Sequence, residues 1–120
     1  MRCARGSLFV LALALAVPAQ VSWTAAPPAL PREQHAMAYD TTRDRVVMFG
    51  GVGSQACAQT WSWDGVGWTL LDPAQSPPPL EDHAMAYDPN ADRVVLFGGR
   101  RADGSFSDEL WEFDGTDWAQ

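Results

Sequence analysis

The most constraining feature of the chain is a six-residue segment, HAMAYD, that occurs at residues 35–40 and again at residues 83–88. The similarity extends beyond it, because residues 35–51 match residues 83–99 at thirteen of seventeen positions, with an offset of 48. Farther along, a two-residue insertion changes the offset to 50, and two tryptophans of the first copy then match two of the second. A period near 50 residues indicates a repeat architecture rather than one irregular domain.

Each period contains four segments typical of short β-strands. HAMAYD is rich in apolar residues and ends at a turn signal, which is DPNAD in the second copy. RVVLFGG is β-branched and aromatic and stops at two glycines, while LWEFD alternates large apolar with acidic residues, as a strand with one buried face does. Asp-Gly, a strong hairpin signal, then leads into a tryptophan-bearing segment. The sequence therefore predicts two four-stranded antiparallel sheets.

The order of strand, paired glycines, variable loop, aromatic strand, tight turn and tryptophan resembles the Kelch repeat, which forms the blade of a β-propeller. The motif residues are Gly50, Gly51, Trp63 and Trp68 in the first copy and Gly98, Gly99, Phe113 and Trp118 in the second. The resemblance predicts an all-β chain, a β-propeller segment of two four-stranded antiparallel Kelch-type blades at residues 35–72 and 83–120. In that family the first strand lines the central channel, so the resemblance places HAMAYD innermost.

Residues 1–19 have the features of a secretory signal peptide. Two arginines precede an apolar run of about ten residues, and small residues follow it. A membrane span needs about twenty apolar residues, so this run is too short for a stable span, and no second apolar segment is long enough. The sequence predicts cleavage after Ala19 or at a neighbouring site, and a secreted or periplasmic mature chain. The alternative is a short membrane anchor.

Two further segments lie outside the predicted blades. Residues 20–34 contain VSWTAAPPALP, which resembles the GWTLLDPAQSPPP of the first copy, and are predicted to be a stray outer strand with a proline-rich linker. Residues 73–82 are predicted to be the proline-rich linker between the blades. The final DWAQ matches only the start of GWTLLDPAQSPPP, which favours an N-terminal piece of a longer propeller.

Two blades by themselves leave two sheet faces without a neighbour. Propellers have about four to eight blades, and a large exposed apolar patch usually marks a missing partner. The expected partners are therefore further blades on the same chain or copies of the chain. Cys57 would lose Cys3 with the signal peptide, which leaves an intermolecular bond, a free thiol or missing sequence as explanations.

The charge of the chain argues against nucleic acid as a partner. The formal net charge is −7, and removal of Arg2 and Arg5 with the signal peptide makes it −9. Phosphate binding requires clustered positive charge, and the chain contains no lysine. A protein or carbohydrate ligand is the expected alternative.

Residues that could support catalysis or bind a metal mostly occupy repeated positions. His35 and His83 share one place in the repeat, which favours hydrogen bonding to a neighbouring strand over metal binding. Asp88, Asn90 and Asp92 begin like a calcium loop, but such a loop needs Gly at its sixth position and Glu at its twelfth, where this chain has Arg and Gly. The sequence therefore predicts no metal, no cofactor and no catalytic residue.

The resemblance also implies one enzymatic alternative, because galactose-oxidase-like copper enzymes are built on Kelch-type propellers. Such a copper site uses Tyr and His ligands with a Tyr–Cys crosslink, and none of these ligands carries over residue by residue. The favoured interpretation is an exported, non-catalytic binding or structural module. The alternative is the N-terminal part of the propeller scaffold of a galactose-oxidase-like or carbohydrate-active enzyme, with its active site outside this segment.

The loops after the paired glycines differ most between the copies, VGSQACAQ against RRADGSFSDE. These loops and the proline-rich linkers are predicted to lie on one side of the sheets. The turns between the first and second strands and between the third and fourth strands are predicted to lie on the other side. Variable loops on a rigid scaffold often carry binding function. Arg100, Arg101 and Phe106 combine charge with an aromatic ring and form the candidate site for a carboxylate, sugar or peptide. The alternative is a solvated loop without a ligand.

Overall fold

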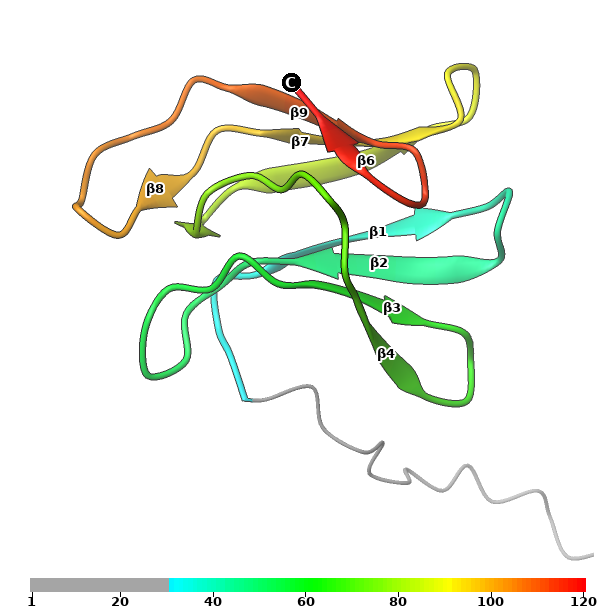
Figure 1. Ribbon diagram of the computed structural model, residues 1–120, viewed down its shortest axis with the longest axis horizontal. Helices are drawn as coiled ribbons and strands as arrows, with labels where there is room; N and C mark the ends of the chain where they lie inside the picture. The colour runs from blue at the N-terminus through cyan, green and yellow to red at the C-terminus, as the bar shows by residue number, and fades with distance from the viewer. Residues whose placement is uncertain (1–30) are drawn as a thin grey trace, which may run out of the picture.

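In the computed structural model, residues 31–120 are described, and every helix or strand in this range is a β-strand (Figure 1). The predicted signal peptide, residues 1–19, and residues 20–30 of the predicted outer strand and linker lie outside the described residues. The all-β fold class is confirmed for the described part. No helix in it is long and apolar enough to cross a membrane.

Two four-stranded antiparallel sheets contain most of the strands (Figure 1). The first sheet consists of β1 (Ala36–Asp40), β2 (Arg45–Phe49), β3 (Thr60–Trp63) and β4 (Trp68–Leu71), in this order. The second consists of β6 (Ala84–Asp88), β7 (Arg93–Phe97), β9 (Leu110–Phe113) and β10 (Trp118–Ala119), also in chain order. Both sheets agree with the prediction from the repeat. Together the described residues form two stacked sheets and not a closed ring.

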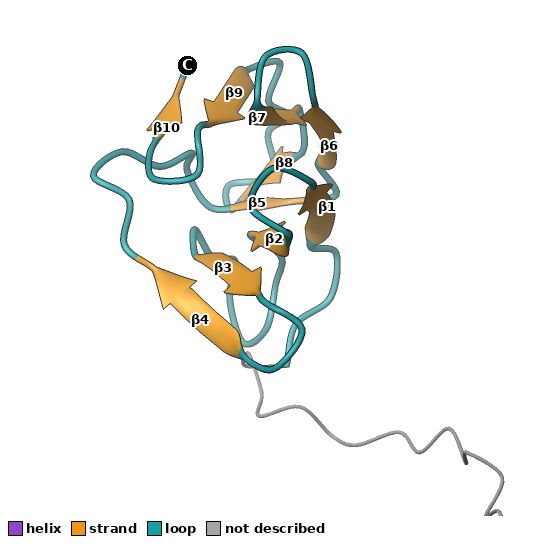
Figure 2. Cartoon of the chain, turned by 90° about the vertical axis from the view of Figure 1, so that its right-hand side faces the viewer, coloured by secondary structure: helices purple, strands orange, loops and turns teal. Residues whose placement is uncertain are grey.

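A two-stranded antiparallel sheet, which the sequence does not predict, lies between the larger ones (Figure 2). It pairs β5 (Leu80–Glu81) with β8 (Arg100–Arg101). β5 falls inside the predicted linker 73–82, and β8 falls inside the predicted variable loop. Two-residue strands leave no periodic pattern to detect. In the first repeat the same place holds a single bridge between Glu33 and Val52.

The backbone repeats as closely as the sequence does. Asp44 and Asp92, at an offset of 48, both adopt a left-handed conformation, with φ angles of 49° and 54°. Gln34 and Asp82, at the same offset, have φ angles of 57° and 55°. Left-handed backbone is uncommon outside glycine. Its recurrence at matching positions therefore shows that the two repeats share local conformation as well as strand order.

The paired glycines of the first repeat allow a close approach of backbone segments. Gly50 and Gly51 have φ angles of 66° and 86°. A Cβ atom at Gly50 would lie 2.6 Å from the Leu80 carbonyl oxygen, and one at Gly51 would lie 2.7 Å from the Glu33 carbonyl oxygen. The Gly51 N–H donates a hydrogen bond to the Leu80 carbonyl oxygen over 2.8 Å. Glycine is needed here because both the left-handed backbone and the crowding exclude a side chain.

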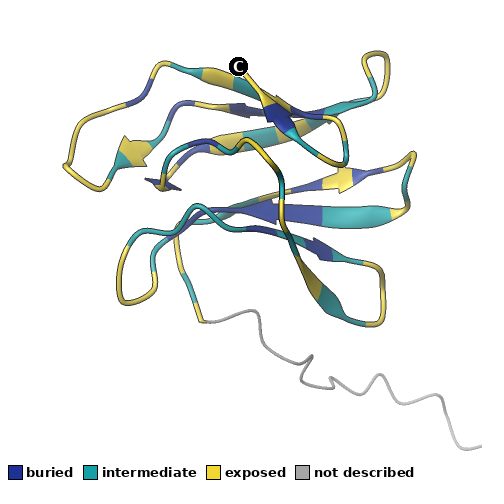
Figure 3. Ribbon diagram, viewed as in Figure 1, coloured by how far each residue is buried: buried dark blue, intermediate teal, exposed yellow. Residues whose placement is uncertain are grey.

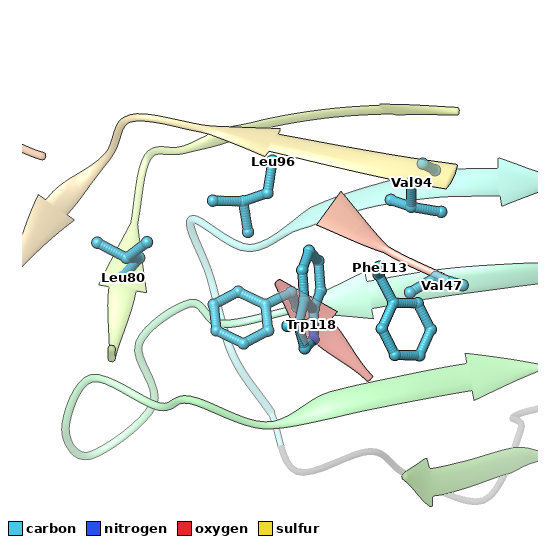
Figure 4. Close-up of a cluster of buried hydrophobic side chains, with 8 residues drawn as sticks. Val47, Leu80, Val94, Leu96, Phe113 and Trp118 are labelled. Carbon is cyan, nitrogen blue, oxygen red and sulfur yellow. The ribbon is translucent and has the colours of Figure 1, made fainter. Parts of the chain in front are cut away.

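Alternation along the strands gives each sheet two faces. The aromatic face carries Trp63 and Trp68 in the first sheet and Phe113 and Trp118 in the second, and the opposite face is the reverse face. The aromatic face of the second sheet packs on the reverse face of the first (Figure 4). The buried core consists of Ala38, Val47 and Phe49 from the first sheet, Leu80 from β5, and Val94, Leu96, Phe113 and Trp118 from the second.

Trp118 lies at the centre of this core. Its ring centroid is 5.3 Å from that of Phe49 across the interface and 5.0 Å from that of Phe113 within its own sheet. The indole Nε1–H donates a hydrogen bond of 2.9 Å to Thr60 Oγ1 on the first sheet. A buried indole N–H needs such a partner. The last strand of the second repeat is thereby fixed to the first sheet by both packing and a polar contact.

Candidate functional site

The loops that follow the paired glycines project from one side of the molecule (Figure 1). The β1–β2 and β3–β4 turns of the first sheet, and the β6–β7 and β9–β10 turns of the second, project from the other side. Residues 52–59 form this loop in the first repeat, and residues 102–109 form its outer part in the second. The prediction that these loops share one side is confirmed. The candidate residues Arg100, Arg101 and Phe106 all belong to the second loop.

Arg100 forms an ion pair with a buried carboxylate. Its Nε–H donates a hydrogen bond of 2.6 Å to Glu81 Oε1, and Nη2 contacts the same oxygen. Glu81 is 7% exposed, and its strand β5 pairs with the strand of Arg100. A buried carboxylate needs a positive partner. The Arg100 guanidinium therefore neutralises Glu81 where the two sheets meet.

Arg101 stabilises the conformation of the loop through hydrogen bonds. Nη1 donates to the Phe106 carbonyl oxygen over 2.9 Å, and Nη2 donates to Ser107 Oγ over 3.2 Å and to Glu109 Oε1 over 3.0 Å. The other oxygen of Glu109 accepts a 3.0 Å hydrogen bond from Trp111 Nε1. These contacts occupy several donors of the guanidinium. They link the loop to strand β9 and leave Arg101 less able to bind a free anion.

Phe106 is the most exposed member of the candidate site, with 81% of its surface exposed. It forms an isolated antiparallel bridge with Arg100, so the backbone under the ring is held although the ring itself is free. A hollow of about 340 Å³, which Phe106 does not line, lies beside this loop and reaches the first-repeat loop. Its lining includes Val52, Gln55, Glu81, Arg100, Arg101 and Gly104.

Of the two histidines, only His83 lies at the interface between the two sheets. His83 is 7% exposed, its ring packs edge-to-face on Phe49 at 5.5 Å, and Nε2 lies 3.1 Å from the Phe49 carbonyl oxygen. Since a carbonyl only accepts, Nε2 carries the proton. Burial lowers the pKa of His83, which holds the ring neutral near pH 7. This agrees with the structural role expected from its repeated position. His35, at the matching position, is half-buried.

The aspartates of the D-x-N-x-D segment are used within turns and between sheets. Asp88 Oδ1 accepts hydrogen bonds from the backbone N–H groups of Asn90 over 2.8 Å and Ala91 over 3.3 Å. Asp92 accepts a 2.8 Å hydrogen bond from the Tyr87 hydroxyl. Among residues 31–120, no three His, Cys, Asp or Glu side chains lie close enough to hold a metal ion.

An ionic cluster between the two sheets is the main feature that the sequence analysis did not find. Arg43 Nη2 lies 2.9 Å from Asp92 Oδ2 of the second sheet, and Nη1 lies 3.0 Å from Asp40 Oδ2 of its own sheet. The hydrogen bonds from Arg43 and then Tyr87 lower the pKa of Asp92 to about 2. A signal was available, because position 43 is one of four departures between the repeats, with Ala91 in the second copy.

Cys57 is a partly exposed free cysteine in the first-repeat loop. Its thiol lies 3.4 Å from the Gln55 carbonyl oxygen, so the S–H group can donate to it. The residue also lines a hollow of about 330 Å³ with Pro31, Arg32, Gly53 and Ser54. No His, Asp or Glu side chain that could act as a base is among these lining residues, and the Arg32 guanidinium donates hydrogen bonds to the Gly50 carbonyl oxygen and to Gln59 Oε1.

The comparison with known proteins adds no relative on which to base a function. No protein-family model matches the chain, and no curated protein matches it at a significant level.

Proposed function

We propose that the chain is a non-catalytic binding or structural module made of two consecutive Kelch-type β-propeller blades. The observation that carries the proposal is the stacking of the sheets. The second repeat lays its aromatic face on the reverse face of the first, with both post-glycine loops on one side. Consecutive propeller blades pack face to face in this manner. The Kelch-type motif order in both repeats supports the assignment.

The binding site of this module is the loop that carries Arg100, Arg101 and Phe106, together with the hollow beside it. Both guanidiniums already pair with glutamates, so a free carboxylate is the least suitable of the three expected ligand classes. A neutral sugar or a peptide suits this loop better, because the exposed Phe106 ring can supply apolar contact and the paired side chains that line the hollow supply fixed polar groups.

The module acts after export, in the periplasm or outside the cell, because residues 1–19 have the features of a signal peptide. The alternative function, a galactose-oxidase-like or carbohydrate-active scaffold, places its chemistry outside residues 31–120. A copper requirement for the activity of a longer parent protein would favour that alternative.

The loop assignment can be tested by NMR on the isotopically labelled chain, titrated with galactose, cellobiose and a hexapeptide library. We expect shift changes at residues 52–56 and 100–107 with at least one probe, and loss of these changes in Phe106→Ser. Val66→Ser is the matched control, because Val66 is 84% exposed but lies in the turn between β3 and β4. Binding that survives Phe106→Ser, or the absence of binding by every probe, would contradict the assignment.

A further inference from the structure

Within the described part of the chain, no other sheet packs on the aromatic face of the first sheet, although the Arg32 guanidinium lies over the Trp61 ring, 5.8 Å from its centroid. Met37, Tyr39 and Leu70 on this face are 50%, 51% and 49% exposed. Trp63 and Trp68 pack on each other with ring centroids 5.6 Å apart. With Met37 and Val46 they line an apolar hollow of about 210 Å³. Figure 3 shows the exposed stretches of β1 and β4 at the edges of this sheet.

The reverse face of the second sheet is also uncovered. Phe97 and Leu110, which pair across β7 and β9, are 53% and 48% exposed. Ala84 and Ala86 on the neighbouring strand β6 are exposed as well. The molecule thus presents an aromatic face at one end and a reverse face at the other.

The interface inside the molecule shows what covers such faces. The aromatic face of the second sheet is covered by a reverse face, through the contact of Trp118 with Phe49 and the hydrogen bond from His83 to the Phe49 carbonyl oxygen. The free ends carry residues equivalent to these three contact residues. At the aromatic end Trp68 and His35 take the places of Trp118 and His83, and at the reverse end Phe97 takes the place of Phe49.

We propose that the chain associates head to tail with a second copy of itself, and that the aromatic face of the first sheet in one copy packs on the reverse face of the second sheet in the other. In this contact Trp68 packs on Phe97 of the second copy. His35, whose Nδ1 is buried without a hydrogen-bond partner, directs Nε2 to the Phe97 carbonyl oxygen. The contact uses two different surfaces, so it is heterologous and can be repeated until a ring closes.

The reverse face at the free end differs from the internal one at positions that affect packing. Leu110 stands where Thr60 accepts the hydrogen bond of Trp118, and Glu112 stands where the buried Ser62 lies. Covering Glu112 removes a carboxylate from water, which opposes association. Arg43, which joins the two sheets internally, is matched by Ala91. The contact between copies is therefore weaker than the internal one and depends on protein concentration.

The proposal is tested by the molar mass of the purified chain, measured by light scattering and analytical ultracentrifugation across micromolar to millimolar concentration at physiological salt. We expect reversible assembly for the natural sequence. Trp68→Glu and Phe97→Glu should each abolish it, because each destroys one of the two faces. Phe106→Glu is the matched control, since Phe106 is exposed but lies on a loop outside both faces. Circular dichroism checks that every variant is folded.

Mixing the two defective variants tests the head-to-tail geometry. The Phe97→Glu variant keeps its aromatic face, and the Trp68→Glu variant keeps its reverse face. Their mixture should therefore form a one-to-one dimer that grows no further. Glu112→Ser should lower the dissociation constant of the natural assembly about tenfold. A chain that stays monomeric at every concentration, or a mixture that yields no dimer, would overturn the proposal. Neither result depends on the ligand loop, so the proposed binding function is tested separately.

Discussion

The two sheets have nearly the same sequence pattern but very different surroundings. Trp118 of the second sheet is 1% exposed and fills the core, whereas Trp68, at the same position of the first sheet, is half-buried on a face without a neighbour. On the reverse faces, the first sheet is the buried one and the second sheet is the exposed one. Phe49 of the first sheet is fully buried, and Phe97 of the second is 53% exposed.

This comparison shows that the repeat determines which residues form each face, while the neighbouring sheet determines whether a face is buried. An aromatic side chain on either face is fully buried only where another repeat packs against it. A substitution at one repeat position is therefore expected to have a different effect on stability in each copy.

The largest difference in destabilisation between the two copies is expected at the matching tryptophans, Trp118 and Trp68. Trp118→Ala removes a buried ring, its contacts with Phe49 and Phe113, and a hydrogen bond to Thr60, and should destabilise the fold by about 3–5 kcal/mol. Trp68→Ala removes a half-buried ring and should cost about 1 kcal/mol in dilute solution. Urea unfolding measured by circular dichroism gives both values. Equal losses would contradict the comparison.

The glycines should show the second-largest difference. Gly50 and Gly98 both have left-handed φ angles, of 66° and 73°, so alanine at either position costs about 1–2 kcal/mol. At Gly50 the added Cβ would also lie 2.6 Å from the Leu80 carbonyl oxygen, while at Gly98 the nearest atom is 3.6 Å away. Overpacking should add about 1–3 kcal/mol to Gly50→Ala alone. Similar unfolding free energies for the two variants would show that β5 can move away from the added Cβ atom without loss of stability.

Much of this fold follows from sequence pattern, because hydrophobic alternation and turn residues act locally. LWEFD predicts strand β9, and the following Asp-Gly forms the expected tight turn, in which Asp114 Oδ1 accepts hydrogen bonds from the Thr116 and Asp117 backbone N–H groups. The paired glycines also mark the ends of β2 and β7. These features need only neighbours in the chain, so one sequence is enough to predict them.

The candidate site was less predictable because its contacts join distant segments. The sequence identifies Arg100 and Arg101 as cations on a variable loop but does not show that Glu81 and Glu109 pair with them. It also does not show the β5–β8 sheet, since two-residue strands form only where two distant segments meet. Phe106, which belongs to no predicted strand, is 81% exposed.

A smaller effect should come from His83, which touches the neighbouring sheet through the Phe49 carbonyl oxygen. Burial lowers the pKa of His83 below its ordinary 6.5, so protonation favours the unfolded chain. The contribution of His83 to stability is complete above about pH 6.5 and is lost as pH falls below that value toward the lowered pKa. Melting temperatures at pH 7.5 and 5.5 should therefore differ less in His83→Gln than in the natural sequence. An unchanged difference would assign the pH dependence to another group.

The smallest effect is expected from the ion pair between Arg43 and Asp92, because both side chains are partly exposed and salt screens the pair. Hydrogen bonds from Arg43, and to a smaller extent from Tyr87 and Thr42, lower the pKa of Asp92 from 3.8 to about 2. The contribution of Asp92 to stability is therefore present above about pH 4 and disappears as pH falls through 2. In Arg43→Met the carboxyl resonance of Asp92 should titrate closer to 3.8. Tyr87→Phe should raise the pKa of Asp92 less, because the Tyr87 hydrogen bond is the second contribution. If Tyr87→Phe had the larger effect, the Tyr87 hydroxyl of the same sheet, and not Arg43 of the first sheet, would be the main partner of Asp92.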